Sequence, residues 1–469
     1  MKKYTLLYLL VAIGMATSAQ TARTFQLVNS TDGESTLTCY LPQNPSGRAV
    51  VACPGGGYSH LAMEHEGTDW TPFFNERGIA YIVLKYRMPN GDRNIPMSDA
   101  YQAIKTVRDS AASWHVNPYD VGIMGSSAGG HLASTVSTHA PWESRPDFTI
   151  LFYPVISMDE KVTHKGSCVG FLGEGRYNKD LVRQFSNDKQ VRCHVTPPAI
   201  ILMANDDRVV PPVTNGVAYY TAMRNQGNEC AMYIYPSGGH GFGYRSSYKY
   251  HDQMLYELSE WLKNLKSPAS DAIRVACIGN SITDGHGIEM RTQLGYPARL
   301  QRGLGDSYHV KNFGVSAQTL LKNGDRPYMQ RPEWQFAQAF NPNIVILKLG
   351  TNDSKPQNWA HGKEFGNDLQ LMLDTLKALP SKPVIYLVTP IKAFENPYNI
   401  NDTIIANEII PIINKVAKKN KIQVIDLYGK VNTKDLLFND GVHPNEKGVE
   451  QMAKIIAEAI REEGMKKSK

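Results

Sequence analysis

The chain has 469 residues, and 42% of them are hydrophobic. This length exceeds what a single hydrophobic core usually supports. We therefore expect two or more domains. The balance of 50 Lys and Arg residues against 44 Asp and Glu residues leaves a net charge of +6, which is small for this length and spread out. Such a charge does not indicate nucleic acid or an anionic membrane as a partner.

The first 19 residues have the pattern of an export signal. Two lysines precede an apolar core at residues 6–15, and small residues follow at 17–19. The apolar run is too short to span a membrane comfortably, and no cysteine for a lipoprotein anchor precedes Cys39. We expect cleavage after Ala19 and a periplasmic or secreted protein with no membrane anchor. An uncleaved N-terminal helix is the alternative.

Apolar, strand-like runs alternate with amphipathic stretches over residues 20–266. This alternation is the pattern of a parallel sheet with crossover helices. The expected strands are residues 49–53, 80–84, 121–124, 149–153, 200–203 and 232–235. Helical periodicity is clear at residues 99–114 and 248–265. Residues 157–195 break the alternation, and we expect them to form an insertion or cap over a site.

Four segments of this first half supply the groups that acyl transfer needs: a nucleophile, a base, an acid that orients the base, and oxyanion donors. Ser127 lies in Gly-Ser-Ser-Ala-Gly between an expected strand and helix, where glycines permit a tight turn. His240 follows the last strand as the base, and Asp207 follows the strand before it. The expected oxyanion donors are the backbone amides of Gly56, Gly57 and Ala128.

Several residues near this site have competing interpretations. Asp206 competes with Asp207, and the spacing to the following Val-Pro pair favours Asp207. His131 is interpreted as a packed helix residue, because the base should come from the loop after the last strand. Three side chains have two possible interpretations, either lining the mouth of the site or being solvated loop residues: Tyr58, Glu64 and Glu66.

These motifs resemble those of α/β-hydrolases of the acetyl-xylan and feruloyl esterase type, over residues of about 25 to 265. The resemblance depends on Pro-Gly-Gly-Gly-Tyr at 54–58, the Ser127 motif, Asp-x-x-Val-Pro at 207–211 and Gly-His-Gly at 239–241. Pro54 replaces the family's more usual histidine and leaves the backbone donors intact. The resemblance implies an α/β-hydrolase fold and hydrolysis of acyl groups on plant polysaccharides or their oligosaccharides.

Residues 267–271 are short, polar and contain a proline, which indicates a linker. A second α/β series follows over residues 272–469. Its expected strands are residues 273–278, 310–313, 344–349, 384–388 and 423–425, and its final helix is 446–463. The two halves share no internal repeat.

The second half contains its own serine, histidine and aspartate. Ser281 lies at the first junction between strand and helix. Asp440 and His443 are three residues apart, so the carboxylate can hold one imidazole nitrogen while the other faces Ser281. The expected oxyanion donors are the Ser281 amide, the Gly314 amide and the Asn352 side chain. Three histidines without a partner pattern are expected in loops or at the surface: His286, His309 and His361.

The blocks around these residues resemble, in the same order, those of the SGNH or GDSL hydrolases across residues 272–463. They are Gly-Asn-Ser at 279–281, Gly314, Gly-Thr-Asn-Asp at 350–353 and Asp-Gly-Val-His at 440–443. The one departure is Asn280, where the family has Asp at a position that mainly sets loop geometry. The resemblance implies a flavodoxin-like sheet and, in an exported carbohydrate-active protein, O-deacetylation of sugars.

Six cysteines in so long a chain do not indicate a disulfide scaffold. Four of them lie in apolar runs and are expected to be buried: Cys39, Cys53, Cys230 and Cys277. Cys168 and Cys193 flank a loop-rich stretch and have the option of pairing. The spacings C-x-x-C and H-E-x-x-H do not occur, so we expect neither a metal nor a cofactor.

The sequence thus predicts an exported bifunctional serine esterase that removes O-acetyl or feruloyl groups from acylated plant polysaccharides such as xylan, or from their oligosaccharides. One alternative is an O-acetylesterase of sialate or another host glycan. Another is one catalytic domain paired with a non-catalytic glycan-binding domain. Peptidase activity is a further alternative for the first domain, because the same triad catalyses both ester and peptide hydrolysis. A lipase is disfavoured, because neither site has a long apolar lid segment.

Overall fold

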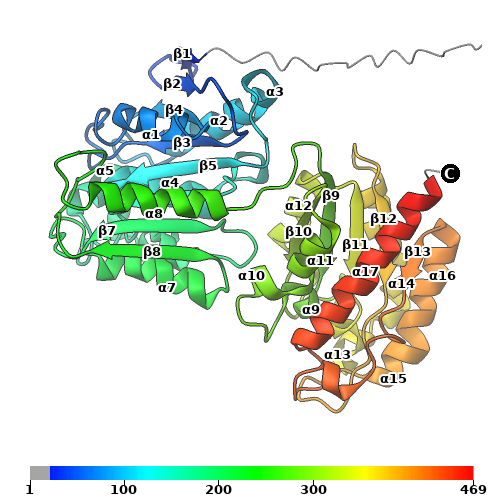
Figure 1. The fold of residues 1–469 in the computed structure, drawn as a ribbon. Coiled ribbons are helices and arrows are strands. Elements are labelled where there is room, and N and C mark those ends of the chain that lie inside the picture. Colours follow the sequence, from blue (N-terminus) through cyan, green and yellow to red (C-terminus); the bar gives the residue numbers. More distant parts are fainter. Residues whose placement is uncertain (1–21, 468–469) are drawn as a thin grey trace, which may run out of the picture.

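The computed structural model describes residues 22–467, which form two α/β units connected by a short segment (Figure 1). The expected export signal at 1–19 lies outside the described residues. The expected linker lies between the last helix of the first unit, which ends at Asn264, and the first strand of the second, which begins at Ile273. Among residues 22–467, no helix combines the length and the apolar character that a membrane crossing requires.

The first unit contains an eight-stranded sheet in the order β1-β2-β4-β3-β5-β6-β7-β8. Its strands are β1 (Arg23–Val28), β2 (Thr36–Leu41), β3 (Ala49–Cys53), β4 (Ala80–Lys85), β5 (Val121–Ser126), β6 (Thr149–Phe152), β7 (Ala199–Ala204) and β8 (Cys230–Tyr235). Strand β2 is antiparallel to β1 and β4, and the pairs from β4 to β8 are parallel. The six strands from β3 to β8 are those expected from the sequence, whereas β1 and β2 were not predicted.

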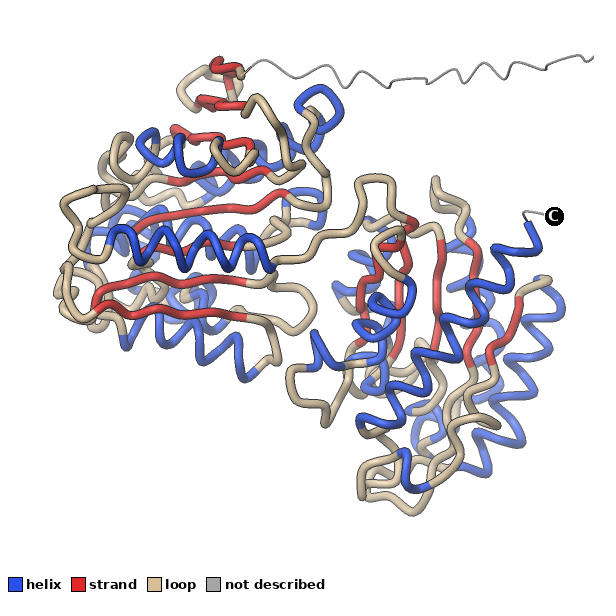
Figure 2. The backbone as a smooth tube through the Cα atoms, in the orientation of Figure 1, coloured by secondary structure: helices blue, strands red, loops and turns tan. Residues whose placement is uncertain are grey.

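The helices of this unit cover both faces of the sheet (Figure 2). They are α1 (Thr71–Asn75), α2 (Asn94–Asp109), α3 (Ala111–Trp114), α4 (Ser127–His139), α5 (Lys165–Leu172), α6 (Lys179–Phe185), α7 (Ala218–Asn225) and α8 (His251–Asn264). Helices α2 and α4 pack together against β3 and β5, and α8 crosses in front of the sheet in Figure 1. Helices α5 and α6 form the insertion that was expected between two strands.

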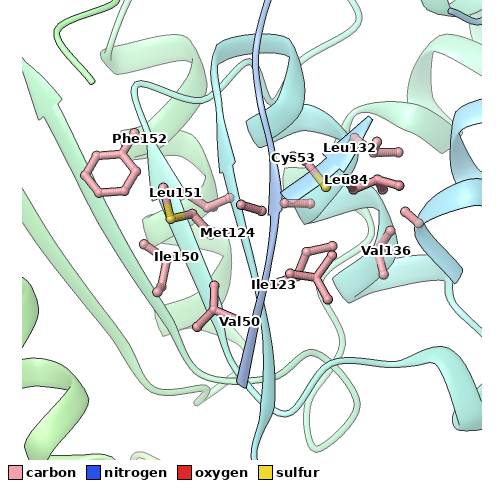
Figure 3. Packing of buried hydrophobic residues seen from close by; sticks show 14 of the residues in the cluster. Val50, Cys53, Leu84, Ile123, Met124, Leu132, Val136, Ile150, Leu151 and Phe152 are labelled. Carbon is pink, nitrogen blue, oxygen red and sulfur yellow. The ribbon is translucent and has the colours of Figure 1, made fainter. Parts of the chain in front are cut away.

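The core of the first unit lies between these layers. Val50, Ile123 and Ile150 come from three neighbouring parallel strands and are completely buried (Figure 3). Leu132 and Val136 of α4 pack in the same cluster. Because the parallel strands are covered on both faces, their sequences are nearly continuous apolar runs, and this made them recognisable.

The second unit contains a parallel sheet of five strands in the order β10-β9-β11-β12-β13, which is the flavodoxin-like order. The strands are β9 (Ile273–Gly279), β10 (Tyr308–Gly314), β11 (Ile344–Lys348), β12 (Val384–Val388) and β13 (Gln423–Ile425). The helices are α9 (Ser281–Asp284), α10 (Arg291–Leu294), α11 (Tyr296–Leu304), α12 (Pro332–Ala339), α13 (Pro356–Trp359), α14 (Phe365–Lys377), α15 (Asp402–Ile404), α16 (Ile410–Asn420) and α17 (Glu446–Lys467). Helices α11 and α17 share one buried cluster, and α12, α14 and α16 share the other. The predicted fold class is therefore confirmed for both halves.

The cysteines differ in part from expectation. All six are free, so Cys168 and Cys193 do not pair. The Cys168 thiol instead donates to the Met158 carbonyl oxygen at 3.0 Å. Cys230 is half-buried rather than buried, because it begins the edge strand β8, whereas Cys39, Cys53 and Cys277 are buried as expected.

Two candidate catalytic sites

Ser127 begins α4 directly after β5, with a backbone φ of +53°. A non-glycine residue in this region is strained, and such strain is common at active sites. The turn is tight because its glycines leave no side chain in the way. A Cβ atom on Gly125 would lie 2.1 Å from the Gly129 oxygen, and one on Gly129 would lie 2.0 Å from the Cys53 oxygen. The start of α4 therefore packs directly against the end of β3.

The structure brings Ser127, His240 and Asp207 together. His240 Nε2 lies 2.8 Å from Ser127 Oγ, and His240 Nδ1 lies 2.7 Å from Asp207 Oδ2. The buried Asp207 carboxylate also accepts the backbone amides of residues 209 and 210 at 2.9 Å each. Asp206 has a different role, because its carboxylate accepts the Gly239 amide at 2.8 Å and so shapes the loop that carries His240.

The loop expected to supply oxyanion donors contains Gly56 and Gly57, with φ values of +131° and +65°. Neither of their amides makes a hydrogen bond within the described part of the chain. The third expected donor, the Ala128 amide, lies in the first turn of α4, where backbone N–H groups lack helical acceptors. All three amides are thus available to an anion beside Ser127.

Glu66 supports this loop from below instead of lining its mouth. Its buried carboxylate accepts the Gly55 amide and the Tyr153 hydroxyl, each at 2.8 Å. The Tyr153 hydroxyl in turn accepts the Gly243 amide at 2.9 Å, and the Tyr153 ring lies 4.9 Å from that of His240. Glu66 and Tyr153 therefore connect the oxyanion loop to the loop that carries the base. No sequence motif indicated this role of Tyr153.

Tyr58 is also buried, whereas Glu64 is exposed in its loop. The Tyr58 hydroxyl lies 2.9 Å from His131 Nδ1, and His131 Nε2 lies 2.9 Å from the Phe185 carbonyl oxygen of the cap. His131 therefore donates from Nε2 and accepts at Nδ1. Burial lowers its pKa to about 4, so this histidine is a neutral packing residue.

The cap places His164 beside the oxyanion loop, where no sequence pattern indicated a functional residue. A Cβ atom on Gly57 would lie 3.3 Å from His164 Cε1. Burial, together with the charge of His240, lowers the pKa of His164. The first site thus has a second imidazole at its rim.

In the second unit, Ser281 begins α9 directly after β9, and Asn280 precedes it. His443 Nε2 lies 2.9 Å from Ser281 Oγ, and His443 Nδ1 lies 2.6 Å from Asp440 Oδ2. The Asn280 side chain is buried and caps α9 by accepting the Ile282 amide at 3.2 Å. Asn280 thus serves loop geometry, as expected where the family has Asp.

Burial lowers the pKa of His443 below its usual 6.5, and the charges of His286 and Lys348 add to this effect, although Asp440 opposes it. The exposed His286 ring lies 4.5 Å from the His443 ring, so this surface histidine is part of the site's surroundings. Lys348 is completely buried at the end of β11, and burial lowers its pKa to about 7.

Gly314 does not supply an oxyanion donor, contrary to the prediction, because its amide donates to Asn312 Oδ1 at 2.8 Å. What Gly314 provides is space. A Cβ atom there would lie 2.3 Å from the Asp284 backbone nitrogen, so only glycine lets the end of β10 pack against α9.

Besides the Ser281 amide, the amide of Ala317 is available for this role, because it makes no hydrogen bond within residues 22–467. Ala317 has a φ of +66° and precedes Gln318, whose carbonyl oxygen accepts the Asn352 side-chain amide at 3.0 Å. That contact joins the Ala317 loop to the other expected donor. An alanine in a left-handed conformation gives no sequence signal, which is why Ala317 was missed.

His309 and His361 both lie outside the two triads. His309 was expected at the surface but is buried on β10, where its ring lies 4.7 Å from Tyr119 and 5.2 Å from Phe340. Burial lowers the pKa of His309 well below its usual value. His361 is half-buried and lies 3.5 Å from Glu364.

One cluster in the described part of the chain has three side chains of the kinds that bind metals. The ligand atoms of Cys193, His194 and Asp284 lie within 4.8 Å of one another. The Arg291 guanidinium is 2.9 Å from the Asp284 carboxylate and already compensates its charge. None of the three residues belongs to either triad, although Asp284 ends the helix that begins with Ser281.

Each triad can carry out acyl transfer through a covalent intermediate. The imidazole takes the serine proton while the serine oxygen attacks an ester carbonyl. Backbone and side-chain N–H groups then stabilise the oxyanion. The imidazole returns the proton to the departing alcohol, and water releases the acyl group by the same steps.

Comparisons with known proteins agree with both halves. The model of the alpha/beta hydrolase fold matches residues 50–243, and that of the GDSL-like Lipase/Acylhydrolase family matches residues 277–451. Both predicted families are therefore confirmed.

Three known proteins illustrate the similarity. An acetylxylan esterase of Xylanibacter ruminicola is 55% identical over 96% of this chain and 98% of its own length. The rhamnogalacturonan acetylesterase RhgT of Bacillus subtilis is 27% identical over 26% of this chain and 62% of its own length. The solved structure of an acetyl ester-xyloside bifunctional hydrolase from Caldicellulosiruptor lactoaceticus is 28% identical, with a TM-score of 0.47, and covers 53% of this chain and 98% of its own.

The pKa of His443 predicts the acid limb of the second site. Catalysis requires neutral His443, so activity at Ser281 should reach half of its plateau below pH 6.5. His286→Asn removes a neighbouring positive charge, which raises the pKa of His443 and moves this limb to higher pH. The measurement is kcat/KM against pH in a Ser127→Ala background, with His361→Asn as the control. A shift to lower pH in His286→Asn would contradict the assignment.

The oxyanion assignment predicts distinct effects at two neighbouring donors. Asn352→Ala removes a side-chain donor and should reduce kcat at the second site by about 10²–10³. Ala317→Gly keeps the amide and suits the positive φ, so kcat should stay close to that of the parent. Both are measured by ester hydrolysis in the Ser127→Ala background. Full kcat in Asn352→Ala would exclude this residue from the oxyanion hole.

Proposed function

The chain belongs to the family of the Xylanibacter acetylxylan esterase and is a carboxylic ester hydrolase, and we propose that it is an exported, bifunctional carbohydrate esterase. Its proposed substrates are O-acetylated xylan or related plant cell-wall polysaccharides and their oligosaccharides. The relatives named for acetylxylan and rhamnogalacturonan support a plant glycan and an acetyl group. Release of ferulate is the alternative for the first site.

The observation that carries this proposal is the presence of two assembled triads in one chain. In each, the serine and aspartate lie within 2.9 Å of the two nitrogens of one imidazole. A binding module has no use for a serine hydroxyl aligned with a base and an orienting acid. We therefore propose that both sites turn over, and that neither unit serves only to bind glycan.

Two different folds with the same chemistry suggest two different acyl positions. The two sites are surrounded by different elements, with the cap helices and His164 beside Ser127, and His286 and the Ala317 loop near Ser281. Because specificity lies in such surroundings, each site is proposed to remove a different acyl group or position. Their connection in one chain raises the concentration of the second site near a substrate that the first has bound.

The test is acetate and ferulate release from acetylated and feruloylated xylooligosaccharides by the wild-type, Ser127→Ala and Ser281→Ala proteins. Each variant should lose one acyl position completely, seen by NMR of the remaining ester protons, and the double variant should lose both. Equal loss at the same positions would show redundant sites. Retention of all activity by one variant would show that the substituted serine does not turn over.

A mixture of the two single variants provides the matched control for proximity. It contains both active sites at the same concentration as the wild-type protein but on separate chains. Faster complete deacetylation by the wild-type protein is expected from the covalent connection. Equal deacetylation rates for the wild-type protein and the mixture would show that proximity of the two sites does not contribute.

Export is proposed from the basic, apolar and small-residue pattern of residues 1–19. Expression of the full gene in a Gram-negative host should give a protein outside the cytoplasm whose first residue is Gln20. N-terminal sequencing of the fractionated protein measures this. An uncleaved protein confined to the cytoplasm would contradict it.

A further inference from the structure

His194 belongs to the first unit, yet its side chain contacts the helix that carries the second nucleophile. It lies between α6 and β7, with a φ of +62° and a side chain only 6% exposed. Its Nε2 atom is 2.8 Å from the backbone oxygen of Asp284 and 3.3 Å from the Asp284 carboxylate. Asp284 is the last residue of α9, and Ser281 is the first. A side chain of the first unit therefore contacts the C-terminal end of α9, the helix of the second unit that begins with Ser281.

The same contact extends to the loop that follows β10. The Asn312 side-chain nitrogen lies 3.1 Å from His194 Nε2 and donates to the Thr283 oxygen at 2.7 Å. The Asp284 carboxylate accepts the Ser316 hydroxyl at 2.5 Å. Ser316 directly precedes Ala317, whose amide is free. His194 thus lies where the nucleophile helix and the oxyanion loop are joined.

The charges around His194 favour a fixed geometry. Although burial disfavours the charged imidazole, Cys193 and Asp284 raise the pKa of His194 to about 10. Burial would likewise raise the pKa of Asp284, but His194, Arg291 and Ser316 together lower it. The Asp284 carboxylate at the end of α9 is thus stabilised jointly by His194, Arg291 and Ser316.

We propose that His194 is a positioning residue of the second active site, supplied by the first domain, so that hydrolysis at Ser281 requires the first domain to be seated against α9. The inference rests on the proposed activity of the second site. His194 touches neither the substrate nor Ser281. It acts through Asp284, which ends α9 and accepts the hydroxyl of Ser316, the residue directly before Ala317.

The test uses the full chain with Ser127→Ala, in which only Ser281 can turn over. His194→Leu keeps much of the side-chain volume but removes the N–H donor, so kcat at the second site should fall about tenfold or more while KM changes little. His194→Gln retains a side-chain N–H that can reach the Asp284 oxygen, and it should restore most of kcat. If His194 contributed only to the stability of the fold, its substitution would not lower kcat while leaving KM nearly unchanged.

Two controls separate this effect from a general disturbance of the interface. Arg224→Gln breaks an exposed ion pair of 3.2 Å to Glu289 that also joins the two units, and it should leave kcat unchanged. His194→Leu in the Ser281→Ala protein should keep full activity at Ser127. Loss of both activities in His194→Leu would indicate general unfolding and would overturn the proposal, as would an unchanged kcat at Ser281.

A failure of the proposed function remains distinguishable from a failure of this inference. If the Ser127→Ala protein does not hydrolyse acetylated xylooligosaccharides, the proposed activity of the second site fails. The rate at which a fluorophosphonate labels Ser281 then tests the positioning role of His194. Slower labelling in His194→Leu than in its parent supports the positioning role, and equal rates, or no labelling in either protein, overturn it.

Discussion

Both serines depend on one constraint, which is that the helix carrying the nucleophile must approach the neighbouring strand more closely than a Cβ atom permits. At the first site, Gly129 brings α4 against the end of β3, where a Cβ atom would lie 2.0 Å from the Cys53 oxygen. At the second, a Cβ atom on Gly314 would lie 2.3 Å from the Asp284 nitrogen. Because of this approach, the loop that supplies oxyanion donors lies beside the first turn of the helix, whose own N–H groups also favour negative charge. Two unrelated sheets satisfy the constraint with different glycines.

Buried carboxylates hold these loops in place without taking part in the chemistry. Glu66 accepts the Gly55 amide beneath the first oxyanion loop, and Asp353 accepts the Leu320 and Leu321 amides beneath the second. Burial raises the pKa of Asp353 to about 6, and its hydrogen bonds from backbone amides oppose this shift. A buried acid is costly unless such donors satisfy it. The cost is offset by a loop geometry that leaves the other amides free for an oxyanion.

The sequence predicted those parts of the molecule that are encoded locally. Parallel strands such as β5 and β7 are buried on both faces and appear as continuous apolar runs, whereas β1 and β2 alternate between more and less exposed residues and were not predicted as strands. The triads were recognised because each member lies in a short motif after a strand. Ala317 was missed because its role depends on a backbone conformation that its residue type does not indicate. His194 was missed because its contacts are with residues about 90 or more positions away, which only the packing of the two units brings together.

The two sites are therefore not equivalent in how they are built. The contacts described around Ser127 come from the first unit alone, including the cap between β6 and β7. The helix that carries Ser281 has only four residues, so it has little stability of its own and depends on what surrounds its end. Part of that surrounding is a histidine from the other unit. An enzyme pair connected only for proximity would tolerate any linker and any orientation, whereas a nucleophile helix held across the interface requires one defined seating of the two domains. On the proposed function, the covalent connection serves the geometry of the second site as well as the local concentration of substrate.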